Sequence, residues 1–364
     1  MVTSTTTRTT AASQPEVRLA AARAVPPLRI VFFGTPEFAV PSFDALLAAT
    51  PHTVVGVVTQ PDRPRGRGQK TSDAPVKARA VAAGVTVLQP DRMKAPAFLE
   101  ALAALHADLG VVAAYGRILT DAILAIPRLG MINVHASVLP RYRGAAPVHR
   151  AVIAGDTTTG VTIMRVVKAL DAGPTIVQEH HPIGPDDTSD EVERALARIG
   201  ARLVVAVVDL LARDNAAEWP QDEAQATYAQ RLTKDDGVID WSWPAARIHN
   251  LIRGLHPWPH AFSLVQGKRV ILRRSTLDLA PGLVDHREPG EGGSGLAMPP
   301  GSIVEANGDR LIVSTGDGLL RIVEIQAEGK RPMTARAFLA GHRLTSGDRF
   351  STAVRPESDT TDVP

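Results

Sequence analysis

The sequence predicts an α/β protein in which a Rossmann-like, doubly wound and mostly parallel sheet is followed by a smaller β-barrel domain. Two patterns carry this prediction. In the first half of the chain, short apolar runs bounded by Gly or Pro alternate with amphipathic segments, as parallel strands and crossover helices do. In the second half, short β-rich runs are separated by Gly and Asp, which is typical of a small barrel. A length of 364 residues accommodates both domains.

The first strand is the apolar run at 28–33, and the turn Gly-Thr-Pro-Glu-Phe follows it directly at 34–38. The same succession of strand, turn and helix then repeats along the first domain. Such sheets bind ligands beyond the carboxyl ends of their strands, so we expect functional residues there. Further strands are predicted at 53–59, 85–88, 109–114, 132–135 and 161–167, and helices at 40–49, 74–83, 96–106 and 203–211.

In the second half, we predict a short helix at 247–253 and strands at 270–274, 301–305, 311–315 and 319–326. Residues 1–28 are poor in acids and contain Arg and Ser, so they are interpreted as a disordered leader or, alternatively, a transit peptide. The predicted organisation is this leader, a first domain at 29–212, a linker at 213–236, a second domain at 237–350 with a loop insertion at 281–300, and a disordered tail at 351–364.

Composition and motifs exclude several classes of function. The chain has 40 Lys and Arg against 38 Asp and Glu, so it is no polybasic protein that coats nucleic acid by charge alone. The absence of cysteine excludes disulfides, thiolate metal sites and a cysteine nucleophile. No apolar run approaches the roughly 20 residues of a membrane span. The turn at 34–38 lacks the second glycine of a dinucleotide site, and the pair His180-His181 lacks a third spaced ligand, so we predict neither NAD nor a metal.

Asn133 and His135 form the first candidate site. They lie two positions apart near the end of a predicted strand, so their side chains share one face. An amide donor beside an imidazole suits acyl transfer, because one stabilises an oxyanion and the other moves a proton near neutral pH. Asp171 follows in a Gly/Pro loop and could orient the histidine, hold a water or act as a general base. The pattern alone leaves open a plainer interpretation, in which these side chains satisfy backbone groups and an Asx turn.

Several motifs follow one another in a distinctive order. They include Gly-Thr-Pro-Glu-Phe-Ala at 34–39, Thr-Gln-Pro-Asp-Arg-Pro at 59–64, Ala-Tyr-Gly-Arg-Ile-Leu at 114–119, Ile-Asn-Val-His at 132–135, Leu-Pro-Arg-Tyr-Arg-Gly-Ala-Ala-Pro at 139–147, Leu-Asp-Ala-Gly at 170–173, Ile-Asp-Trp at 239–241 and Pro-Trp-Pro at 257–259. Together they make the chain resemble the methionyl-tRNA formyltransferase family over almost its whole length.

The resemblance implies formyl transfer from N10 of 10-formyltetrahydrofolate, the co-substrate, to the α-amino group of methionine on initiator tRNA. Asn133, His135 and Asp171 would be the catalytic residues, and no metal or covalent enzyme intermediate is required. The second domain would be an OB-like barrel that assists tRNA binding. Ala136 stands where the family usually has Gly, so it could narrow the pocket. The folate pocket would fall on Arg117, Ile118, Leu119, Ser137, Val138, Leu139 and Pro140.

The segment 59–79 carries six basic residues against two acids on a Gly/Pro-rich loop, which suits contact with phosphates. An arbitrary basic loop is more often a solvated surface, but this one leaves the carboxyl end of a strand, on the catalytic face. Three tryptophans of the second half, Trp241, Trp243 and Trp258, could stack bases, although packing at a domain interface is the favoured interpretation. The predicted tRNA contacts are Arg63, Arg65, Arg67 and Lys70 in this loop, and Lys268 and Arg269 in the second domain.

The remaining expectations concern partners and alternatives. We expect a monomer without membrane contact, in the cytoplasm of a bacterial-type cell, or in the mitochondrial matrix if 1–28 is a transit peptide. The alternatives on the same catalytic domain are a 10-formyltetrahydrofolate hydrolase and a sugar-nucleotide N-formyltransferase. A hydrolase would not need the basic 59–79 loop. A catalytically silent RNA-binding protein is disfavoured by the intact Asn133, His135 and Asp171.

Overall fold

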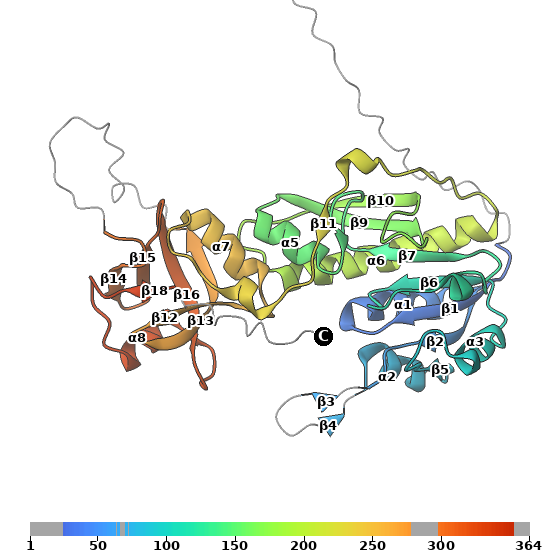
Figure 1. Ribbon diagram of the computed structural model, residues 1–364, viewed down its shortest axis with the longest axis horizontal. Coiled ribbons are helices and arrows are strands. Elements are labelled where there is room, and N and C mark those ends of the chain that lie inside the picture. Colours follow the sequence, from blue (N-terminus) through green and yellow to red (C-terminus); the bar gives the residue numbers. More distant parts are fainter. Residues whose placement is uncertain (1–24, 63, 66–69, 72, 278–297, 353–364) are drawn as a thin grey trace, which may run out of the picture.

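The computed structural model describes residues 25–62, 64–65, 70–71, 73–277 and 298–352. Two separate sheets form its framework, and helices α5 (Pro147–Ala154) and α7 (Ala245–Gly254) lie between them (Figure 1). The fold is the predicted one, a mostly parallel α/β domain followed by a smaller antiparallel domain. Residues 1–24 of the predicted leader, 281–297 of the predicted insertion and 353–364 of the predicted tail lie outside the described residues.

The sheet of the first domain has the strand order β10-β9-β7-β6-β1-β2-β5. Neighbouring strands from β5 to β7 are parallel, and β9 is antiparallel to both of its neighbours. The central strands are apolar and buried on both faces, as strands covered by helices on two sides are. The strands are β1 (Arg29–Gly34), β2 (Thr53–Val58), β5 (Val87–Leu88), β6 (Leu109–Ala113), β7 (Met131–His135), β9 (Thr158–Arg165) and β10 (Thr175–Pro182).

Helices cover both faces of this sheet. One face packs on α1, α2, α5 and α6, and the other on α3 and α4, so each face has its own apolar core. Short elements complete the domain. The helices are α1 (Val40–Ala48), α2 (Pro75–Ala82), α3 (Pro96–Ala103), α4 (Asp121–Leu124) and α6 (Ser189–Ala212), with a 3-10 turn η1 (Glu37–Ala39); the short strand pairs are β3 (Pro64–Arg65) with β4 (Lys70–Thr71), and β8 (Arg143–Gly144) with β11 (Tyr228–Ala229).

Several elements differ from the sequence-based prediction, and three of them are long elements of the first domain. Helix α6 spans 24 residues, whereas only 203–211 was predicted, and both α5 and β10 were missed. The missed first half of α6 is charged, but its start carries a capping box in which Thr188 and Glu191 exchange hydrogen bonds. Strand β10 has exposed polar side chains because it lies at the edge of the sheet.

The second domain is an antiparallel sheet of strand order β14-β15-β16-β13-β12-β18, with β17 beside β16. A bridge between Ser302 and Arg349 joins the segments before β14 and β18, so the sheet curls into a half-barrel around an apolar core. Its elements are β12 (Ala261–Val265), β13 (Lys268–Leu277), β14 (Ile303–Asn307), β15 (Arg310–Ser314), β16 (Leu319–Ala327), β17 (Met333–Thr334), β18 (Phe350–Ser351) and α8 (Ala335–Gly341); the linker holds η2 (Glu223–Gln225) and η3 (Lys234–Gly237).

The two domains are joined by direct contacts between α5, α6 and α7. Ser189 at the start of α6 donates a hydrogen bond of 2.8 Å to the carbonyl of Gly254. Glu191 of the first domain pairs with Arg274 of β13 at 2.7 Å. Ala146 and Ile153 of the first domain pack into the apolar core of the second. Within the described residues, no helix is both long and apolar enough to cross a membrane.

Candidate active site

Strand β7 carries Asn133 and His135 at its carboxyl end. Because residues two apart on a strand share a face, both side chains line one cavity of about 640 Å³ at the carboxyl end of the strand. Asn133 is half-buried, while His135 is buried with 5% of its surface exposed. The two predicted catalytic groups of this strand therefore do reach a common ligand-sized space.

The His135 ring is held in one orientation. Its Nε2 donates a hydrogen bond of 2.9 Å to the backbone carbonyl of Tyr142. Its Nδ1 lies 3.8 Å from Oδ2 of Asp171. A carbonyl only accepts, so the proton on Nε2 is fixed, and Nδ1 is the nitrogen left to exchange a proton with a bound substrate. The distance to Asp171 is longer than a hydrogen bond, so the carboxylate can act on the imidazole only through its charge.

Asp171 lies in the loop at 166–174 that connects β9 to β10. Its backbone has φ of +48°, in the left-handed region that Asp tolerates better than most residues. Its Oδ2 accepts a hydrogen bond of 2.8 Å from the backbone N–H of Gly144. Asp171 also lines the cavity, so the structure brings together all three residues predicted to be catalytic.

The lining of the cavity includes both apolar and polar side chains. The apolar ones include Ile118, Leu119, Val166, Val167 and Leu170, which suit a flat heterocycle. Ile118 is 81% exposed, which is unusual for an aliphatic side chain of this size outside a binding surface.

The residues predicted for the folate pocket separate into two groups. Arg117, Ile118 and Leu119 line the cavity, and the Arg117 guanidinium donates to the Pro90 and Asp91 carbonyls at 2.8 and 3.1 Å. The side chain of Arg117 therefore braces a neighbouring loop. The second group, Ser137, Val138, Leu139 and Pro140, does not line the cavity.

The second group instead forms a turn packed against β9. Ser137 is fully buried, and its hydroxyl donates to the Arg141 carbonyl at 2.6 Å. The amide of Leu139 donates to the Thr162 hydroxyl at 3.1 Å. These bonds hold the turn against β9, and Ala136, directly after the strand, lines the cavity.

The polar residues of the lining include His149 and Glu193, which the sequence analysis did not single out. Burial, with the charge of Arg150, lowers the pKa of His149 to about 4. Burial, with the charge of Asp190, raises the pKa of Glu193. The Pro at the first turn of α5 and the capping box of α6 were the available signals, because they place these two side chains near helix starts.

The basic segment 59–79 has two parts. Side chains near its two ends form ion pairs, whereas the middle of the segment is described only in its backbone or lies outside the described residues. Lys77 forms ion pairs with Asp62 and with Asp73, and Arg79 pairs with Asp44 at 3.0 Å. Of the predicted tRNA contacts, Arg63 and Arg67 lie outside the described residues, and Arg65 and Lys70 belong to the paired strands β3 and β4.

The predicted contacts of the second domain, Lys268 and Arg269, are both exposed at the start of β13. The Arg269 guanidinium lies 3.9 Å from the centre of the Phe262 ring. Three tryptophans of the second half lie in different environments. Trp241 is buried in the core of the second domain, Arg247 covers Trp243 at 3.7 Å, and Trp258 is 51% exposed. The favoured packing interpretation therefore fails for Trp258.

No group of three or more His, Asp or Glu side chains in the described part of the chain is arranged to hold a metal ion. His180 and His181 point to opposite faces of the edge strand β10, as alternate residues of a strand do.

Comparison with known proteins identifies the family. Residues 28–208 match the family described as Formyl transferase, and residues 231–343 match Formyl transferase, C-terminal domain. Methionyl-tRNA formyltransferase of Moorella thermoacetica is 46% identical over 321 residues, which cover 88% of this chain and 98% of that protein. Methionyl-tRNA formyltransferase of Roseiflexus sp. is 43% identical over 329 residues, covering 90% and 96%.

A solved N-formyltransferase from Helicobacter canadensis, in complex with folinic acid and dTDP-3-aminofucose, shares the fold. It aligns with a TM-score of 0.59 at 17% identity, covering 82% of this chain and 99% of that chain. The α/β domain, its cavity and the half-barrel behind it thus define a formyl transferase. Because the similarity to the Moorella and Roseiflexus proteins extends over nearly their full length, the chain belongs to the methionyl-tRNA formyltransferase family.

Proposed function

We propose that this enzyme transfers the formyl group from N10 of 10-formyltetrahydrofolate to the α-amino group of methionine on initiator methionyl-tRNA. The observation that carries the proposal is the convergence of Asn133, His135 and Asp171 on one cavity with a partly apolar lining. Family membership supports the choice of formyl donor and of aminoacyl-tRNA as acceptor.

The reaction is a direct attack. The neutral α-amino nitrogen forms a bond to the formyl carbon, and the carbonyl electrons move onto oxygen to give a tetrahedral oxyanion. The Asn133 amide and a protonated His135 Nδ1 donate to this oxygen, and the Asp171 carboxylate stabilises the imidazolium across 3.8 Å. The bond from carbon to N10 then breaks. The proton lost by the α-amino group reaches N10, so tetrahydrofolate leaves and no metal or covalent enzyme intermediate takes part.

The lining of the cavity offers apolar surface to both substrates. The pterin would lie against Ile118 and Leu119, while backbone groups near Arg117 would bond to its polar edge. The acceptor methionine would lie against other apolar residues of the lining, such as Phe38 and Val148.

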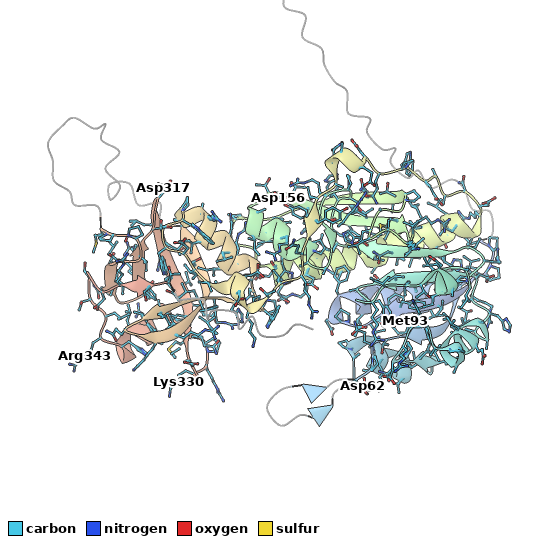
Figure 2. All side chains as sticks on the ribbon, viewed as in Figure 1. Asp62, Met93, Asp156, Asp317, Lys330 and Arg343 are labelled. Carbon is cyan, nitrogen blue, oxygen red and sulfur yellow. The ribbon has the colours of Figure 1, made fainter. Side chains whose placement is uncertain are left out.

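We propose that the tRNA lies across the side of the molecule shown lowest in Figure 2. Asp62, at the base of the β3–β4 segment, and Lys330 and Arg343, at the periphery of the second domain, all lie on that side of the view. Basic side chains along such a path contact phosphates, and Lys268 and Arg269 are the predicted contacts on β13. Arg63, Arg65, Arg67 and Lys70 are the predicted contacts in the loop.

We further propose that the enzyme works as a monomer in the compartment that holds the ribosomes. The product is a substrate of translation initiation, which places the reaction where translation takes place.

The test is transfer of radiolabelled formyl from 10-formyltetrahydrofolate to methionyl-initiator tRNA. Wild type and Asn133→Ala are compared, with Asn215→Ala as the matched control, because Asn215 is exposed in the linker. We expect label on the initiator tRNA, a loss of about 10²–10³-fold in kcat for Asn133→Ala, and full activity for Asn215→Ala.

Parallel reactions distinguish the alternatives. Elongator methionyl-tRNA, an amino-sugar nucleotide and a reaction without RNA are run beside the initiator. Formate released equally with or without RNA would make the protein a hydrolase. Label on the amino sugar in preference to the tRNA would make it a sugar-nucleotide formyltransferase, and either result would overturn the proposed acceptor.

A further inference from the structure

The linker between the domains is in contact with the catalytic loops. Strand β11 of the linker pairs in parallel with β8, which directly follows the turn after β7. The amides of Arg143 and Ala145 donate to the Thr227 and Ala229 carbonyls at 2.8 and 2.9 Å. The linker, although its composition is that of a polar spacer, therefore packs directly against the backbone near Asp171.

Gln221 is the linker residue that reaches Asp171 itself. Its Nε2 donates to the backbone carbonyls of Asp171 and Gly173 at 2.8 and 2.7 Å. Its Oε1 accepts from Arg143, from Nη2 at 2.8 Å and from Nε at 3.1 Å. One amide group thus ties the 166–174 loop to the catalytic turn, using both its donor and its acceptor.

Arg143 makes this link rigid. Its side chain is buried, with 1% exposed, and its guanidinium also donates to both carboxylate oxygens of Glu223 at 2.7 and 2.9 Å. A planar guanidinium with partners on several nitrogens has one favourable orientation, so it fixes the Gln221 amide in turn. The hydrogen bond to Glu223 raises the pKa of Arg143 against the opposing effect of burial, so Arg143 is held as a cation.

The backbone held by Gln221 is one that would otherwise relax. A non-glycine residue with φ of +48° is in a sparsely populated conformation, which surrounding contacts must maintain. That conformation directs Oδ2 of Asp171 both to the amide of Gly144 at 2.8 Å and to Nδ1 of His135 at 3.8 Å. A rotation of this peptide would move the carboxylate away from both.

We propose that Gln221 is a positioning residue for formyl transfer, which holds the backbone of Asp171 so that its carboxylate faces His135. The inference rests on the proposed function for its kinetic consequence, but the geometry of the free enzyme carries its structural half. Gln221 is not among the residues that line the cavity, so its effect on the reaction would pass through Asp171.

The variant that isolates this role is Gln221→Glu. The carboxylate has the size of the amide and still accepts from Arg143, but it has no hydrogen to donate to the two carbonyls of the loop. The matched control is Gln225→Glu, because Gln225 is exposed and its side chain bonds only to Asp222 at 2.7 Å. Thermal unfolding checks that both variants are folded.

The first readout needs no substrate. The Gly144 amide donates to Asp171, whereas the neighbouring Ala145 amide donates to Ala229 of the linker. In Gln221→Glu we expect hydrogen exchange at Gly144 to rise at least tenfold while Ala145 stays protected. Equal loss of protection at both amides would mean that the linker detaches as a whole, and unchanged protection at Gly144 would mean that Gln221 does not hold Asp171. Either result would overturn the proposal.

The second readout is kinetic. We expect Gln221→Glu to lower kcat by up to about 10²-fold with little change in KM, because misplacement of a catalytic group acts on the transition state. In an Asp171→Asn background the same substitution should have little further effect, since the residues act as one unit. Additive losses would refute action through Asp171. Absence of activity in the wild type would refute the proposed function and leave the exchange result to decide the positioning role.

Discussion

The buried side chain of His149, which lines the cavity, leads to a specific prediction about the stability of the protein in acid. His149 has a pKa of about 4 in the folded protein because it is buried and lies near Arg150. In the unfolded chain a histidine titrates near 6.5. The unfolded state therefore binds a proton between these two values that the folded state refuses, so the free energy of unfolding falls as the pH is lowered from about 6.5 to about 4.

The magnitude follows from the two pKa values. A difference of about 2.5 units corresponds to about 3 kcal/mol once both titrations are complete, and about 2 kcal/mol of this is lost by pH 5. His149→Gln keeps a polar side chain of similar size but has no titration. We therefore expect wild type to lose about 2 kcal/mol more than His149→Gln between pH 7 and pH 5.

The assay is urea unfolding at pH 7, 6 and 5, with the free energy of unfolding compared between the two proteins at each pH. Glu193→Gln serves as a control from the same cavity, because the pH dependence that Glu193 contributes to stability has the opposite sign. Burial raises the pKa of Glu193, so its neutral form favours folding at low pH, and that contribution is lost as the pH rises. If the free energy of unfolding had the same pH dependence in wild type and in His149→Gln, the expected effect of His149 on stability would be refuted.

Two further substitutions test the framework of the site. Gly200→Ala in α6 would place a Cβ 2.6 Å from Val134 of the catalytic strand, so we expect loss of both melting temperature and kcat, although alanine ordinarily favours a helix by about 1 kcal/mol. A more stable, fully active Gly200→Ala would contradict the close approach. Glu191→Gln should weaken the capping box with Thr188 and the ion pair with Arg274, at a cost of about 1 kcal/mol at pH 7 by urea unfolding. Against the opposing effect of burial, hydrogen bonds from Thr188 and Arg274 lower the pKa of Glu191 to about 2, so the wild-type advantage is present above about pH 4.5 and disappears toward pH 2; a constant difference down to pH 2 would argue against it.

The parts of the fold that the sequence predicted well are those where burial controls composition. Strands β1 and β6 are buried along almost their whole length, so they appear as continuous apolar runs. The pair Asn133 and His135 was recognisable because a period of two places both on one face. In these places the local pattern and the tertiary environment impose the same requirement.

The pattern was less informative where an element is half solvated. Strand β10 lies at the edge and carries Gln178, Glu179 and His180, so its alternation is blurred by polar residues on both faces. Likewise, a turn does not show which way it folds. The hydroxyl of Ser137 donates to the Arg141 carbonyl, and that bond depends on backbone geometry absent from the sequence.

The linker is the clearest case of a role that local sequence cannot reveal. Residues 213–236 are polar and were interpreted as a spacer, yet Gln221 and Glu223 are bonded to Arg143, nearly 80 positions earlier in the chain. If the chain were truncated after residue 212, the first domain would retain Asn133, His135 and Asp171, but the Arg143 guanidinium would lose those partners. A buried charge without a partner costs about 3–5 kcal/mol. The linker is therefore in direct contact with the candidate active site, because the Gln221 side chain bonds to the backbone of the residue whose carboxylate faces His135.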